Sequence, residues 1–154
     1  MTLQIDIPGD RTLRLEHLLL DQNGTLSDRG ELIDGVADRL TTIRNVLSVH
    51  ILTADTFGTL DEVTASLGVE GHRVSTGEEK RVFMDRLGAQ TCVAIGNGRN
   101  DVPMLTGAAL GLAVLGPEGT ANAAATAADI LCRSILVALD LLIEPKLLIA
   151  TLRH

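Results

Sequence analysis

The chain has 154 residues, of which 45% are hydrophobic and 21% charged, and its formal net charge is −7. This length and balance are typical of one globular domain and exclude a disordered chain. The acidic charge, without a basic stripe, argues against nucleic-acid binding. No apolar run approaches the about 20 residues of a membrane span. The start MTLQIDIPGD has no apolar targeting core. We therefore expect a cytoplasmic protein without nucleic-acid or membrane partners.

The first predicted elements are strands. A Pro-Gly-Asp turn signal near the start predicts a β-hairpin within residues 1–20, leading into a buried strand at residues 15–20. Later apolar runs predict strands at residues 47–53, 92–96, 110–116 and 129–133. The two cysteines, Cys92 and Cys132, lie in such runs and are expected to be buried thiols rather than zinc ligands. No repeat or linker divides the chain, so residues 1–154 are predicted to form one domain.

Helices are predicted between these strands from their start and stop signals. Asp34 is the expected cap of a helix that ends near Asn45, and Thr59 and Thr76 each open a capping box. Gly68 and Gly88 are the expected stops of the latter two helices. Further helices are predicted with Pro103 near the start of one, at residues 120–127 and at residues 134–152. Strands that alternate with helices predict an α/β fold of three layers, a Rossmann-like parallel sheet with helices on both faces.

The C-terminal segment, residues 136–152, is unusually apolar and contains Pro145. It is predicted to be one helix interrupted at the proline or two short helices. We expect it to be buried against the sheet. The alternative is an interface between copies of the chain in a homo-oligomer.

Polar residues gather where the apolar runs stop, which is where ligands bind in parallel sheets. Asp21 ends the first buried strand, Thr53 ends the second, and the third leads into a glycine-rich loop that ends at Asp101. A carboxylate in such a place can attack phosphorus, and Lys80 would neutralise phosphoryl oxygens. Oxygen ligands from carboxylates suit Mg²⁺.

The order of these groups resembles the haloacid dehalogenase superfamily. LLLDQNGTL resembles its first motif, an apolar strand followed by Asp-x-Asp-Gly-Thr, and HILTAD resembles its second. Lys80 matches the third motif. AIGNGRNDVPML resembles the fourth, Gly-Asp-Gly-x-Asn-Asp, in the form shared with P-type ATPases. Within the superfamily, the chain resembles small proteins described as soluble P-type ATPase-like, which have no membrane part.

The resemblance implies a phosphorylated substrate, Mg²⁺ as cofactor and an aspartyl phosphate on Asp21. The residues it implies as catalytic are Asp21, Asn23, Thr53 and Lys80. The residues implied to bind phosphate are Gly24, Thr25, Thr53, Ala54, Lys80 and Asn100. The implied metal ligands are Asp21, Asn23, Asn97 and Asp101, with Asn23 contributing its backbone carbonyl and Asp101 binding or positioning the ion.

Two residues depart from the family pattern. Asn23 replaces the second aspartate of the first motif, which serves as general acid and base in the family's phosphatases and is typically worth about 10²–10⁴ in rate. Asn97 replaces a metal-binding aspartate. The expected substrates are therefore compounds whose leaving groups depart as stable anions, such as acyl phosphates and nucleotides. No segment between the motifs is long enough for a cap domain, so we expect a capless member.

Three alternatives to a phosphohydrolase or phosphotransferase follow from the same residues. Asn23 and Asn97 favour a non-catalytic protein that responds to phosphate or metal on the same fold. A response-regulator receiver domain also uses an aspartate, a threonine and a lysine, but its phosphorylated aspartate follows the third strand. A dinucleotide-binding domain is disfavoured because no G-x-G-x-x-G follows the first strand.

Overall fold

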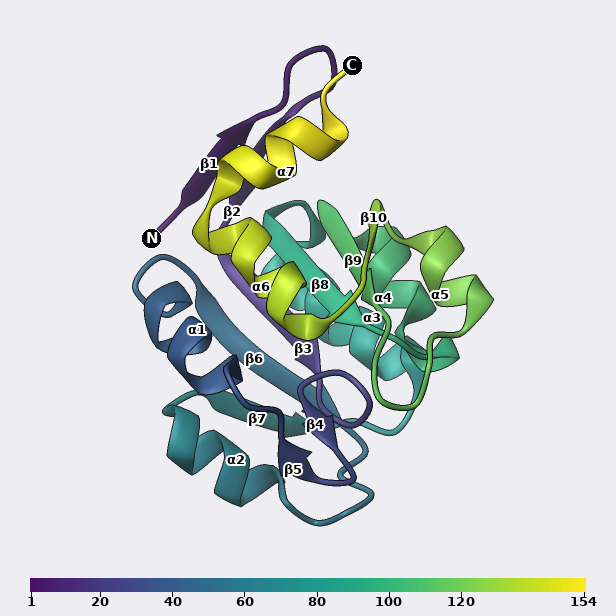
Figure 1. Ribbon diagram of the computed structural model, residues 1–154. Coiled ribbons are helices and arrows are strands. Elements are labelled where there is room, and N and C mark those ends of the chain that lie inside the picture. Colours follow the sequence, from purple (N-terminus) through teal and green to yellow (C-terminus); the bar gives the residue numbers. More distant parts are fainter.

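A six-stranded parallel sheet forms the centre of the computed structural model, which describes residues 1–154 (Figure 1). In spatial order its strands are β10 (Ile130–Cys132), β9 (Leu110–Val114), β8 (Cys92–Gly96), β3 (His17–Asp21), β6 (Ser48–Thr53) and β7 (Glu70–Arg73). The chain builds the sheet outward from β3 to β7, then returns to the other side of β3 and continues to β10. Strand order thus reverses between β3 and β8, and such a reversal opens a crevice at the carboxyl ends of the strands.

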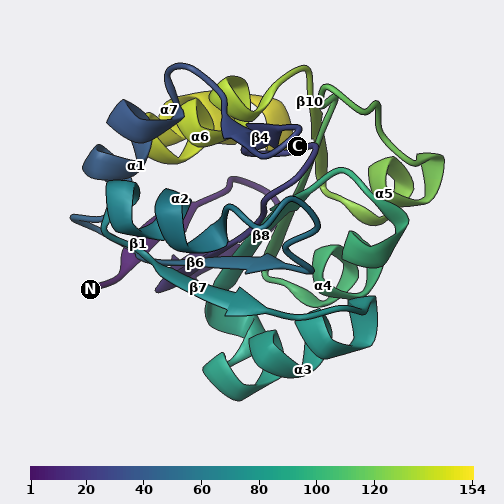
Figure 2. The ribbon, with the colours of Figure 1, turned by 90° about the horizontal axis from the view of Figure 1, so that it is seen from below.

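Helices cover both faces of the sheet, as the alternation of strands and helices predicts (Figure 2). The helices are α1 (Val36–Ile43), α2 (Leu60–Leu67), α3 (Gly77–Leu87), α4 (Val102–Gly107), α5 (Asn122–Ala127), α6 (Ile135–Ile143) and α7 (Pro145–Leu152). Neighbouring side chains of a strand point to opposite faces. Leu18 and Leu20 therefore pack with α1, α2 and α6, whereas Leu19 packs with α3, α4 and α5. The three-layer α/β prediction is confirmed.

An N-terminal hairpin precedes the sheet. β1 (Leu3–Asp6) pairs antiparallel with β2 (Thr12–Leu15), and β3 begins at His17. The predicted strand at 15–20 is therefore displaced, because Leu15 still pairs with Leu3 of the hairpin. The other predicted strands lie within two residues of their expected bounds.

The loop after β3 carries a small flap made of β4 (Ser27–Asp28) and β5 (Glu31–Leu32). Between β3 and β6 the chain holds only this flap and α1, and between β6 and α3 it holds only α2 and β7. No cap domain is inserted at either place, as expected.

Two predicted helix caps are wrong. Asp34 does not cap α1, because Gly35 occupies the cap position with a φ of 91° and no side-chain hydrogen bond is made there. Thr59 does not cap α2 either, since the backbone N–H of Leu60 donates instead to Asp55 Oδ1 at 3.0 Å. The cap at Thr76 is confirmed, with its Oγ1 accepting from the Glu79 N–H at 3.1 Å.

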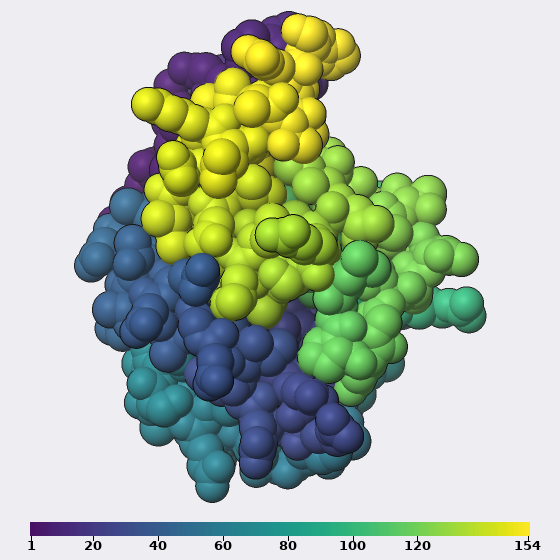
Figure 3. Space-filling model, in the orientation of Figure 1, coloured from purple at the N-terminus to yellow at the C-terminus, as the bar shows by residue number.

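The C-terminal segment forms two helices, with Pro145 at the first turn of α7. Most of α6 is buried against α1 and the sheet, and α7 lies beside the hairpin (Figures 1 and 3). The prediction of burial against the sheet is confirmed for α6 but wrong for α7, which packs beside the hairpin and buries only Leu148. Cys92 and Cys132 are buried and unpaired, also as predicted. None of the helices combines the length and the apolar character needed to cross a bilayer.

Candidate functional site

A pocket of about 390 Å³ lies at the carboxyl ends of β3, β6 and β8, on the edge of the sheet where the sequence places its polar groups. Its walls come from the loops after these strands and from the loop after β9. The lining residues are Asp21, Asn23, Thr53, Ala54, Thr56, Phe57, Asn97, Gly98, Asn100 and Glu118.

Asp21 is the last residue of β3 and is largely buried, with one side toward the pocket. Its Oδ1 accepts a hydrogen bond from Lys80 Nζ at 3.0 Å, and its Oδ2 accepts from Thr25 Oγ1 at 3.2 Å. Lys80 comes from α3, is fully buried, and also donates to Asp101 Oδ1 at 2.7 Å. One ammonium thus lies between two carboxylates, which leaves this buried group with a net negative charge.

Asp101 organises the loop that follows β8. Its Oδ2 accepts from the backbone N–H groups of Asn97 and Gly98, at 3.1 and 3.0 Å. Gly96 is needed beneath it, since a Cβ there would lie 2.4 Å from the carboxyl carbon of Asp101. Because both oxygens of Asp101 already accept hydrogen bonds, its side chain holds the loop and Lys80 in place from below the pocket.

Thr25 and Asn97 connect the first and fourth motifs. The Thr25 hydroxyl lies 3.2 Å from both Asp21 Oδ2 and Asn97 Oδ1, and the Asn97 amide donates to the Gly119 carbonyl at 3.0 Å. These contacts orient the side-chain carbonyl oxygen of Asn97 toward Thr25, whose hydroxyl also contacts Asp21. Gly24 has a φ of +79°, and a Cβ there would meet Asn97 Nδ2 at 2.8 Å, so the loops approach closely only with glycine at this position.

The buried charges shift one another's pKa values. Burial, followed by repulsion from Asp101, raises the pKa of Asp21 to about 7, although Lys80 and Thr25 oppose this rise. Burial alone would lower the pKa of Lys80, but the two carboxylates outweigh it and raise that pKa. Lys80 therefore stays charged, and one lysine does not fully compensate two carboxylates.

The remaining predicted residues lie around the same pocket. Thr53 is buried, and its Oγ1 accepts from the Asp55 N–H at 3.0 Å. Ala54 and Asn100 are exposed on the rim. Asn23 faces the pocket with a buried Oδ1 that has no hydrogen-bond partner. The structure thus brings the predicted residues together, with Thr25, Lys80 and Asp101 beneath the pocket rather than in its wall.

Four lining residues are absent from the predicted set: Thr56, Phe57, Gly98 and Glu118. Glu118 is exposed and follows β9, so the rule that ligands bind at strand ends would have found it had it been applied to this strand. Phe57 is half-exposed and lies against the flap, where a Cβ on Gly30 would come within 2.8 Å of Phe57 Cβ. No sequence signal marks Phe57, because the contact depends on how the flap folds.

Comparisons with known proteins agree with this geometry. Residues 3–109 match the profile of a family described as haloacid dehalogenase-like hydrolase. The uncharacterized protein MJ0073 of Methanocaldococcus jannaschii is 44% identical over 61 residues, which cover 40% of this chain and 66% of that protein.

Two solved structures are similar in fold. The 3-deoxy-D-manno-octulosonate 8-phosphate phosphatase of Moraxella catarrhalis, in complex with magnesium, phosphate and KDO, superposes with a TM-score of 0.69 at 18% identity, over 89% of this chain and 92% of that one. A zinc-transporting PIB-type ATPase gives 0.65 at 27% identity, over 79% of this chain but 20% of that one. From the profile match, the sheet order and the motif residues gathered at one pocket, we conclude that the chain belongs to the haloacid dehalogenase-like hydrolases.

Proposed function

We propose that this protein is a Mg²⁺-dependent phosphohydrolase or phosphotransferase that acts through an aspartyl phosphate on Asp21. One observation carries the proposal: the Asp21 carboxylate ends a central strand, lines an open pocket, and has the Lys80 ammonium at 3.0 Å. An aspartate so placed can act as a nucleophile toward phosphorus, and a fixed cation beside it suits the negative oxygens of a phosphoryl group.

The side chains around the pocket fit Mg²⁺. Asp21, Asn23 and Asn97 offer carboxylate, amide and carbonyl oxygens, the donors that this ion prefers. The Oδ1 atom of Asn23 is buried without a partner, and the two carboxylates beside Lys80 leave a negative charge uncompensated. Bound Mg²⁺ would supply that missing positive charge and neutralise phosphoryl oxygens. Asp101, with both oxygens occupied, would position the loop rather than ligate directly.

In the proposed reaction, a carboxylate oxygen of Asp21 attacks phosphorus and forms the new O–P bond. The bond from phosphorus to the leaving group breaks, and its electron pair departs with that group. Lys80 and the Thr53 hydroxyl would hold the phosphoryl oxygens during transfer. Attack by water on the aspartyl phosphate then releases phosphate and restores Asp21, whereas attack by another acceptor completes a phosphotransferase reaction.

The leaving group is limited by Asn23. An amide cannot donate and recover a proton as a carboxyl group can, so an alkoxide leaving group would receive no help from this position. Carboxylates and nucleoside diphosphates leave as stable anions and need no such help. We therefore propose acyl phosphates or nucleotides as the substrate class, taken into a pocket that no inserted domain covers.

Beryllofluoride, which mimics an aspartyl phosphate, tests the proposal without knowledge of the substrate. Calorimetry would follow its binding in the presence and absence of Mg²⁺, for the wild type and for Asp21→Asn. Asp140→Asn is a matched control, because it removes a carboxylate that pairs with Arg39 at 2.8 Å on another part of the molecule. We expect binding by the wild type and by Asp140→Asn, only with Mg²⁺, and none by Asp21→Asn.

Binding that persists in Asp21→Asn, or that ignores Mg²⁺, would contradict the proposed phosphoryl site. Absence of binding by the folded wild type at millimolar Mg²⁺ would overturn the proposal in favour of a non-catalytic protein. After a positive result, acetyl phosphate and ATP are the first substrates to assay, beside an alkyl phosphomonoester that should react far more slowly.

A further inference from the structure

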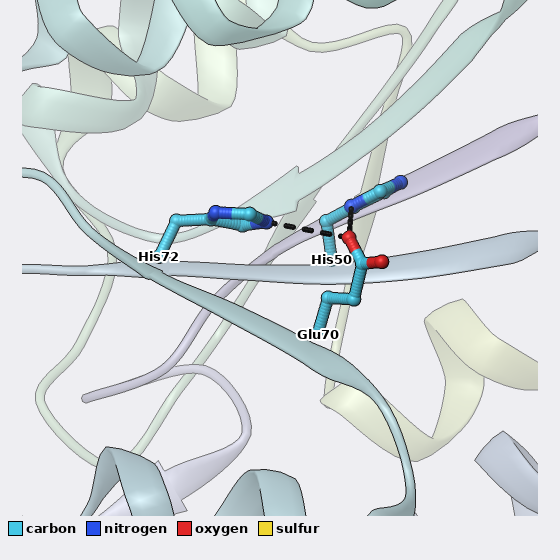
Figure 4. A group of neighbouring side chains, drawn as sticks. All are labelled: His50, Glu70 and His72. Carbon is cyan, nitrogen blue, oxygen red and sulfur yellow. Dashed lines mark ion pairs between the residues drawn. The ribbon is translucent and has the colours of Figure 1, made fainter.

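A second polar cluster lies outside the pocket lining, on the face of the sheet that α3 covers. His50 of β6 and Glu70 and His72 of β7 point toward one another there (Figure 4). In the parallel register His50 stands beside Glu70, and His72 stands beside Leu52. The ring of Phe83 from α3 closes one side, with its centroid 5.5 Å from that of His50 and 4.4 Å from that of His72.

The three side chains bring three possible ligand atoms together. His50 Nδ1 lies 3.3 Å from Glu70 Oε2, and His72 Nε2 lies 3.6 Å from the same oxygen. All three atoms are within 4.8 Å of one another. Ligand atoms of a tetrahedral zinc ion, each about 2.0–2.1 Å from the metal, lie about 3.4 Å apart. Two of the three spacings already match, and rotation of the partly exposed His72 ring would close the third.

Neither ring nitrogen has a satisfied hydrogen bond. Both His50 Nδ1 and His72 Nε2 are buried and lie within 3.6 Å of the Glu70 carboxylate, but neither makes a well-aligned hydrogen bond to it. Buried polar atoms are normally hydrogen-bonded, and a cation bound between these two nitrogens and the carboxylate would satisfy all three groups.

A further histidine orients the central ring. His17 Nδ1 lies 3.3 Å from His50 Nε2. If His50 donates its Nε2–H to His17, the lone pair of Nδ1 is directed at Glu70. Histidine ligands of metals are commonly fixed in this way by a partner on the other ring nitrogen.

We infer that His50, Glu70 and His72 form a binding site for a transition-metal cation of the zinc class, with one coordination position open to solvent. Two imidazoles and one carboxylate favour Zn²⁺ or Co²⁺ over Mg²⁺, which prefers oxygen donors. The ion would join β6 to the edge strand β7. This site is separate in residues and in ligand type from the pocket at Asp21.

The cluster is accessible to an ion. The Glu70 side chain is 71% exposed, whereas that of His50 is 8% exposed. A pocket of about 280 Å³ adjoins the cluster, since its lining includes His17, His50 and Glu70. A cation can therefore enter past Glu70 and meet the buried nitrogen of His50.

Titration with Co²⁺ followed by visible absorption tests the site, because four-coordinate Co²⁺ bound to imidazole absorbs far more strongly than six-coordinate Co²⁺ bound to oxygen. The variants are His72→Ala and Glu70→Gln, both at partly or largely exposed positions, with His154→Ala as a control that removes an exposed histidine elsewhere. Asp21→Asn controls for binding in the other pocket. Thermal unfolding with Zn²⁺ is the second readout.

We expect strong absorption at one equivalent in the wild type, His154→Ala and Asp21→Asn. His72→Ala should lose it, and Glu70→Gln should bind at least about 10-fold more weakly. His17→Ala should weaken binding by about 10–100-fold, as loss of an orienting partner does. Zn²⁺ should raise the unfolding midpoint of the wild type and not that of His72→Ala. Weak absorption in the wild type, or a signal that survives His72→Ala and depends on Asp21, would overturn the inference.

Discussion

Two charged clusters lie on the same sheet but differ in burial and in hydrogen bonding. At the carboxyl end, Lys80 is fully buried and both of its carboxylate partners are hydrogen-bonded further by Thr25 or by backbone N–H groups. In the second cluster the carboxylate of Glu70 is largely exposed, and the ring nitrogens facing it make no well-aligned hydrogen bond. The first cluster therefore maintains its own geometry, whereas the second is completed only by a cation.

The contrast follows from where the side chains originate. Loops after β3 and β8 wrap their own backbone N–H groups around Asp101, which fixes the first cluster even without ligand. The second cluster is made by side chains alone, from the neighbouring strands β6 and β7. Removal of the Lys80 ammonium should consequently cost much at the first cluster, whereas removal of the Glu70 charge should cost little at the second.

The largest expected effect comes from restoring an acid to the first cluster. Asn23→Asp places a carboxyl group in the pocket beside Asp21, whose charge would raise the new pKa toward that of a working acid. Hydrolysis of an alkyl phosphomonoester should rise by about 10²–10⁴, which is about 3–5 kcal/mol of barrier. The rate of acetyl phosphate hydrolysis should rise far less. Steady-state assays with both substrates measure the difference, and Asn45→Asp, at an exposed position away from the pocket, controls for the added charge. Equal gains for the two substrates would contradict the role given to Asn23.

Loss of the buried ammonium should destabilise the protein strongly. Lys80→Met leaves Asp21 and Asp101 facing each other without compensation, which typically costs about 3–5 kcal/mol. Arg39→Met is the matched control, since its pair with Asp140 is partly exposed and should be worth under about 1 kcal/mol. Urea unfolding with a chelator present measures both. Adding Asp21→Asn to Lys80→Met should recover part of the lost stability. Equal losses in the free energy of unfolding for Lys80→Met and Arg39→Met would refute the argument.

The raised pKa of Asp21 predicts how stability depends on pH in metal-free protein. The folded pKa is about 7 and the ordinary value 3.8, so the folded state holds the proton more tightly than the unfolded one. This group's contribution is present below the ordinary value and is lost as pH rises toward 7. Asp21→Asn should thus gain stability relative to wild type, on the order of 3 kcal/mol, between pH 4 and 7. If the stabilities of the two proteins changed with pH in parallel across this range, the pKa of Asp21 would not be raised in the folded state.

The sequence alone could predict most of the first cluster. Strand ends are marked by abrupt changes from apolar to polar residues, and the carboxyl ends of parallel strands meet at one edge. Asp21, Thr53 and Asn97 could be grouped on that basis. The sequence could not indicate that both carboxylate oxygens of Asp101 would accept hydrogen bonds from Lys80 and the loop N–H groups, since this depends on the local turn.

The second cluster could not be found in this way. His17, His50 and His72 lie on three different strands, and nothing in their spacing along the chain relates them. They meet only because β3, β6 and β7 pair in one particular register, with His50 beside Glu70. The helix caps failed for a similar reason: Asp55, in the loop before Thr59, folds back to take the role expected of Thr59.

The smallest effect should come from neutralising the exposed carboxylate of the second cluster. In metal-free protein, Glu70→Gln removes a contact between a largely exposed acid and a histidine that burial keeps neutral, so stability should change by less than about 1 kcal/mol. The same substitution should abolish most of the stabilisation by Zn²⁺. Urea unfolding with chelator and with Zn²⁺ separates the two effects. A large loss with chelator would mean that Glu70 already holds a charged histidine, and the two clusters would then be alike in needing no added cation.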